Sequence, residues 1–169
     1  MKKVVLSAVI FGAMMLVASF AGAQSTQITT AQGFSVTAPA TLVAQAPKTG
    51  TTNTGLAYTM TFYTATLPNG DVYAVAVAEY NTAQLDPASL TGALNNIAAT
   101  QAATIIDQMD RPVSGQPGRL AALKLTEHCR AMWLGAVRGN KLYQFMFMTD
   151  PAVTSDMNAA KLFITSATI

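Results

Sequence analysis

The central part of the chain alternates apolar and polar residues in the way expected of a β-hairpin. Residues 58–63 have a period of two, with a large apolar side chain at every second position. Asn69 and Gly70 follow, and this pair favours a tight hairpin turn because both residues tolerate a positive φ. The pattern predicts a return strand over residues 72–80, which are rich in valine and alanine.

After the hairpin the apolar spacing changes to three and four residues, which predicts a long helix. We expect Asp86 to cap its N-terminus and Pro87 to take the first helical position, where the missing N–H costs nothing. The helix should end before Pro112. Its apolar stripe consists of Leu90, Leu94, Ile97, Ala98, Ala102, Ile105, Ile106 and Met109. The opposite side carries Asn96, Ala103, Asp107 and Asp110.

The second half of the chain returns to strands. Residues 120–127 read as a strand, and residues 129–137 and 142–148 read as a hairpin that turns at Gly139. These last two strands are apolar on both faces, which is typical of the middle of a sheet covered on both sides. A closing helix is predicted from about Ser155.

The segment before the first hairpin carries weaker signals. Residues 34–38 alternate and predict a strand that ends at Pro39. Residues 48–55 contain no apolar side chain and are interpreted as a mobile loop. The element order predicts one α+β domain over residues 24–169, with a mostly antiparallel sheet and helices packed on it.

The first residues of the chain have the pattern of an export signal. Lys2 and Lys3 precede an apolar run over residues 4–17, and Ala21 and Ala23 form a small-residue cleavage site. We therefore predict a signal peptide over residues 1–23, cleavage after Ala23, and a periplasmic or secreted protein. An uncleaved membrane anchor is the alternative reading, although the run is shorter than a helical membrane span needs.

Removal of the leader changes the charge. The 169-residue chain has ten Lys and Arg against eight Asp and Glu, and loss of Lys2 and Lys3 leaves eight of each sign. A neutral chain without a basic cluster lacks the charge pattern of a nucleic-acid binder or of a protein held on an anionic membrane. The single cysteine, Cys129, leaves no pair for an internal disulfide.

His128 and Cys129 are adjacent, and each is unique in the chain. A Cys–His nucleophile is not predicted, because neighbours on a strand point to opposite faces. Cys129 would share its face with Ala131 and Trp133, as a packed core thiol whose pKa is raised by burial. A serine hydrolase would need His128 as its base, but the sequence contains no Gly-x-Ser-x-Gly elbow to hold a nucleophile.

Other candidate chemistry is equally sparse. A zinc site would need a second histidine or more cysteines, and the chain has neither. Asp71, Glu79 and Asp86 show no spacing that would pair two carboxylates for acid–base work. The thioethers of Met132, Met146 and Met148 could suggest a copper site, but core packing is the preferred interpretation. No catalytic residue, metal ligand or cofactor site is predicted.

Three short motifs in the C-terminal half resemble the PsbP-like fold. They are Pro117-Gly118-Arg119, the hairpin sequence at residues 139–143, and the ending at residues 163–169. Leu120 stands where relatives often have glutamate, and Ala167 where they often have an aromatic residue. The resemblance implies an α/β/α sandwich and a binding or assembly module, with no catalytic residue to transfer.

These observations predict a non-catalytic, exported binding or assembly module of unknown partner. Two alternatives stay open. One is a carrier of a small apolar ligand, held between the sheet and a helix. The other is an unrecognised hydrolase.

Overall fold

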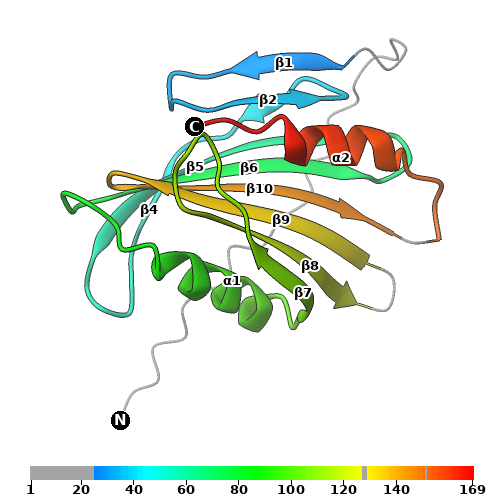
Figure 1. Ribbon diagram of the computed structural model, residues 1–169. Coiled ribbons are helices and arrows are strands. Elements are labelled where there is room, and N and C mark those ends of the chain that lie inside the picture. The colour runs from blue at the N-terminus through cyan, green and yellow to red at the C-terminus, as the bar shows by residue number, and fades with distance from the viewer. Residues whose placement is uncertain (1–24, 127–128, 151) are drawn as a thin grey trace.

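An antiparallel sheet of eight strands forms the centre of the computed structural model, which describes residues 25–126, 129–150 and 152–169 (Figure 1). The strands are β3 (Val43–Ala44), β4 (Lys48–Thr51), β5 (Ala57–Thr66), β6 (Val72–Tyr80), β7 (Thr104–Asp110), β8 (Gly118–Thr126), β9 (Cys129–Arg138) and β10 (Lys141–Thr149). Their order is β3-β5-β6-β10-β9-β8-β7, and β4 also pairs with β5. The predicted single α+β domain with a mostly antiparallel sheet is confirmed.

The most apolar strands occupy the middle of this sheet, as their two-sided pattern predicts. β10 lies between β6 and β9 and is antiparallel to both. Leu142 and Phe145 of β10 face opposite sides of the sheet, and both are buried. The sheet therefore has a hydrophobic core on each face.

One face is covered by α2 (Met157–Thr165) and by a separate two-stranded sheet of β1 (Thr26–Thr29) and β2 (Ser35–Ala38) (Figure 1). The last residues of the chain lie along β2, because Ser35 and Thr168 form an antiparallel bridge. The core beneath is aromatic, with rings meeting edge to face at centroid distances of 5.2 to 6.4 Å. The buried rings of this core belong to Phe34, Tyr73, Tyr143, Phe145, Phe147 and Phe163.

The other face is covered by α1 (Ser89–Thr100), which packs on β8 and β9 (Figure 1). Leu90 and Leu94 point from the helix into the core that contains Trp133. Gly135 makes room for the indole, since a Cβ at this position would lie 2.3 Å from the Trp133 ring and 3.1 Å from Leu90. A glycine in mid-strand here serves close packing between sheet and helix.

The long predicted helix is wrong in its second half. α1 ends at Thr100, and Thr104–Asp110 forms the edge strand β7 instead. Ala102 has a φ of 49°, a left-handed value that takes the chain out of the helix. The isoleucines at 105 and 106 continue the helical spacing, but their branched side chains also favour a strand, and pairing with β8 decides the outcome. Asp107 and Asp110 consequently lie on β7.

Two further local predictions need correction. α1 begins at Ser89, so Pro87 precedes the helix, and the carboxylate of Asp86 accepts the N–H of Ala88 at 2.8 Å in the turn before it. Residues 48–51 were expected in a loop but form β4, because backbone pairing with β5 needs no apolar side chain.

The remaining elements lie close to their predicted positions. β2 covers the strand expected at residues 34–38, and the hairpin of β5 and β6 turns at Asn69 and Gly70. α2 begins two residues after Ser155, and Asp156 accepts two backbone N–H groups as its N-cap. Among the described residues, no helix is long and apolar enough to span a membrane.

Candidate binding cleft

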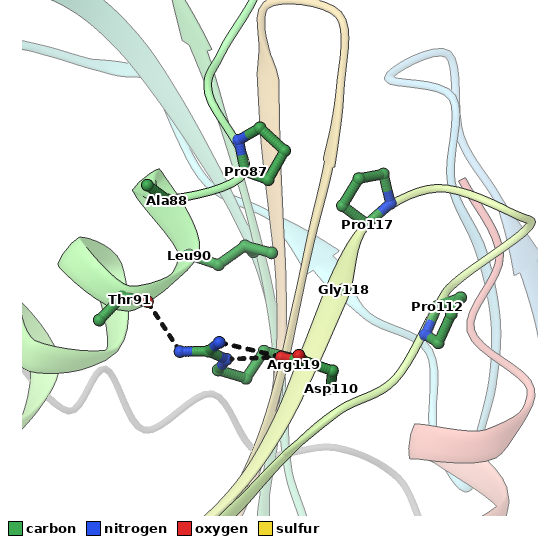
Figure 2. A pocket seen from close by; sticks show the side chains of 9 residues that line it. All are labelled: Pro87, Ala88, Leu90, Thr91, Asp110, Pro112, Pro117, Gly118 and Arg119. Carbon is green, nitrogen blue, oxygen red and sulfur yellow. Dashed lines mark hydrogen bonds and ion pairs between the residues drawn. The ribbon is translucent and has the colours of Figure 1, made fainter.

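A cleft of about 340 Å³ opens between the start of α1 and the adjoining ends of β7 and β8 (Figure 2). This volume lies at the lower end of the range for ligand sites in proteins. Its walls come from two stretches of the chain that are far apart in sequence. They are Pro87, Ala88, Leu90 and Thr91 on the helix side, and Asp110, Pro112, Pro117, Gly118 and Arg119 on the strand side.

The cleft has an apolar end and a polar end. Pro87 and Pro117 face each other across its upper part in Figure 2, with Leu90 below them. Arg119, Asp110 and Thr91 lie together at the other end.

Arg119 links the helix to the edge strand. Its Nε and Nη2 donate to Oδ1 of Asp110 at 3.1 and 2.9 Å, and its Nη1 donates to Oγ1 of Thr91 at 2.7 Å (Figure 2). A guanidinium has five N–H bonds, and these contacts use three of them. Within the described part of the chain the other two have no hydrogen-bond partner. The group is therefore fixed in position and still able to donate.

The charge at the polar end is balanced. The carboxylate of Asp110 is 81% exposed and forms an ion pair with Arg119, whose side chain is 25% exposed. A pair so accessible to water contributes little to folding stability. Oδ2 of Asp110 has no partner among the described residues, so the pair presents an acceptor beside the donors of Arg119.

The backbone around the cleft has limited freedom. The three prolines fix φ at their positions and contribute no N–H. A Cβ on Gly118 would lie 2.3 Å from the carbonyl oxygen of Arg111, so only glycine fits where β8 enters the cleft. The shape of the site is thus largely set before any ligand arrives.

A second depression, of about 280 Å³, adjoins the first and shares Asp110 and Arg119 with it. Gln108 and Met109 complete its lining on β7. The surface therefore continues from the cleft along the edge strand, where Met109 is 55% exposed.

Of the candidate residues singled out from the sequence, those that the structure describes do not come together. His128 lies outside the described residues. We expected Cys129 to be a packed core thiol. At the start of β9 it is only partly buried. Burial raises the pKa of this thiol, as predicted, with Asp150 adding to the rise and Arg130 opposing it.

The candidate ligands of a copper site are separated by the sheet. Met146 and Met148 pack on the α1 face, whereas Met132 packs on the α2 face. The scattered carboxylates also stay apart. Asp71 and Glu79 lie at opposite ends of β6, and Asp86 is exposed before α1. Among the described residues, no group of three or more His, Cys, Asp or Glu is placed to hold a metal ion.

Asp71 is fully buried and has a structural role. Its carboxylate accepts from Ser155 at 2.7 Å and from Asn69 at 2.9 Å, which ties the β5–β6 turn to the segment before α2. The buried hydroxyl of Tyr73 has no partner within the described residues. Burial, followed by the charges of Asp71 and Asp156, raises the pKa of that tyrosine strongly.

Sequence reasoning missed the cleft. It placed Asp110 on the solvent side of a helix and noted Arg119 only for the family resemblance. One signal was available, because Arg119 is in phase with the buried Ala121 and Leu123 of β8. A charged residue on the apolar face of a strand should have a polar partner. The partners of Arg119 are Asp110 at the end of β7 and Thr91 in the first turn of α1.

Comparison with known proteins gives no assignment: no protein-family model matches the chain, and no curated protein shows significant sequence similarity to it.

Proposed function

We propose that this chain is an exported, non-catalytic binding or assembly module, and that the cleft between α1 and β7–β8 is its binding surface. The observation that carries the proposal is the Arg119–Asp110 pair. It is anchored by Thr91, is partly exposed, and has hydrogen-bonding capacity left over at the rim of an apolar hollow. Rigid walls reduce the entropy that a binding site loses when it captures a partner.

The sequence supports the rest of the proposal. The leader at residues 1–23 predicts export, and the resemblance to the PsbP-like fold implies a module that binds or assembles. The alternative of an apolar-ligand carrier placed its ligand between the sheet and a helix. Leu90, Leu94 and Trp133 fill that space at α1. The cleft at the start of α1 is therefore the preferred location for a bound partner.

Export has a direct test. The protein recovered from the exported fraction should begin at Gln24, as measured by intact mass and N-terminal peptide sequencing. A mature form that retains residues 4–17 would contradict export by cleavage and would support the membrane-anchored alternative.

The binding surface is tested by filling it. Ala88 is exposed on the cleft wall, so Ala88→Tyr should obstruct the cleft without removing a core contact. Lys161→Tyr on the exposed side of α2 is the matched control. Tagged proteins are used to capture partners from the native cell envelope. We expect a partner that wild type and Lys161→Tyr retain and Ala88→Tyr loses. Equal capture by all three would place the binding surface elsewhere.

A further inference from the structure

We infer that the cleft takes an extended peptide segment, with an aliphatic side chain in its apolar end and a main-chain amide on the Arg119–Asp110 pair. This inference rests on the proposed function, because it names the class of partner for the same site. It follows from the unused hydrogen-bonding groups at the polar end of the cleft and from the apolar surface at its other end.

The polar end suits a neutral group that both donates and accepts. Arg119 has two N–H bonds left to donate, and Oδ2 of Asp110 is left to accept. A free carboxylate would be attracted by the guanidinium but repelled by the adjacent Asp110, which already balances its charge. A peptide unit offers a C=O to the arginine and an N–H to the aspartate, so it matches both groups.

The apolar end suits an aliphatic side chain. Pro87, Pro117 and Leu90 present hydrocarbon to the cleft, and none of the described residues that line it is aromatic. The hollow of about 340 Å³ is also open to the second depression along Gln108 and Met109. An occupant that continues in both directions, as a chain does, fits this surface better than a compact small molecule.

The peptide is not expected to extend the sheet beyond β7. The backbone N–H of Gln108 already donates to the carboxylate of Asp107 at 2.8 Å. A register shift between Ile105 and Asp107 also interrupts the pairing of this strand. A charged side chain and a bulge are both features that discourage strand addition at an edge. The binding should therefore use the cleft rather than the free edge.

The test is a titration of the isotopically labelled exported protein, followed by backbone amide NMR. The probes are acetyl-Ala-Leu-Ala-amide, the same peptide with Asp or Lys in place of Leu, and octanoate as an apolar carboxylate. We expect the leucine peptide to shift the amides of Leu90, Thr91, Asp110 and Arg119. Ala88→Tyr should weaken its binding about tenfold, and Arg119→Met should do so to a similar extent, since hydrogen bonds to a charged group are lost. Lys161→Met should bind as wild type, and the dispersion of each spectrum checks that the variant is folded.

The outcomes separate the two proposals. Binding of octanoate in the cleft without binding of the leucine peptide would overturn the peptide inference and leave a binding cleft for acids. Ala88→Tyr could abolish partner capture while no capped peptide binds to the wild-type protein. This result would overturn the peptide inference and leave the proposed binding cleft in place. No binding by any probe, together with capture that ignores Ala88→Tyr, would overturn both.

Discussion

The two faces of the main sheet are closed in different ways. On the α2 face, aromatic rings of the sheet meet Phe34, which directly precedes β2, and Phe163 of α2, and the C-terminal residues bridge to β2. On the α1 face, one helix of 12 residues packs on β8 and β9, and the cleft opens beside its first turn. The α2 face is closed by a continuous aromatic core. The α1 face also leaves the Arg119–Asp110 pair accessible at its edge.

The largest expected effect lies on the α2 face. Phe163 is fully buried between Tyr73 and Phe145. Phe163→Ala should lower the free energy of unfolding by about 3–5 kcal/mol, because it removes a buried ring and leaves a cavity. Denaturant unfolding measures this. A change in unfolding free energy near zero would contradict the role given to the α2 face. The same holds if the folded variant lost as much free energy of peptide binding as of unfolding.

A smaller effect is expected beneath α1. Gly135→Ala would place a methyl group against the Trp133 ring and close to Leu90. We expect a loss of about 1–3 kcal/mol, because the indole or the helix must shift to accommodate it. Shifts of the Leu90 and Thr91 amides would show that the helix moves. A variant as stable as wild type would show that the packing between α1 and the sheet is looser than described.

Tyr73→Phe should stabilise the protein by about 1 kcal/mol, since it removes a buried hydroxyl that has no partner among the described residues. The raised pKa of Tyr73 adds a pH dependence. Wild type should lose stability as the pH rises above about 10, where the tyrosine of the unfolded chain ionises first. The variant should lose less over the same range. A destabilised variant would mean that the hydroxyl has a partner in solution.

The smallest effect is expected at Cys129, which is only partly buried at the start of β9. Cys129→Ala should cost less than about 1 kcal/mol, because part of the side chain is already in water. The thiol should react with maleimide more slowly in the folded protein than after denaturation, since burial raises its pKa and lowers the fraction of thiolate. Equal labelling rates in the two states would contradict this assignment.

The sequence was sufficient for most of the sheet. Strands with two apolar faces predicted the central positions of β9 and β10, and Asn69-Gly70 predicted the first hairpin. It was insufficient at residues 104–110, where the same isoleucines satisfy a helical stripe and an edge strand. Local spacing cannot decide between them, because the deciding contact is with β8, which comes later in the chain.

The cleft was missed for the same reason. It is formed where β7 meets the start of α1, and β7 itself was interpreted as helix. Asp110 reaches Arg119 only once β7 is paired with β8, and Thr91 reaches it only once α1 is packed on β8. Pattern analysis identifies the face on which a residue lies, whereas a site between elements depends on how those elements are placed together.

The central claim is that the partner is met at the cleft beside α1 and not on the α2 face. Site-specific photocross-linking in the native envelope tests it directly, with benzoylphenylalanine placed at Met109 in one strain and at Lys161 in another. Both positions are exposed. Met109 lies on β7 in the depression that adjoins the cleft, where the probe leaves the cleft open, and Lys161 lies on α2. We predict a discrete cross-linked partner from position 109 and none from position 161. Cross-linking from position 161 alone, or equally from both, would contradict the account.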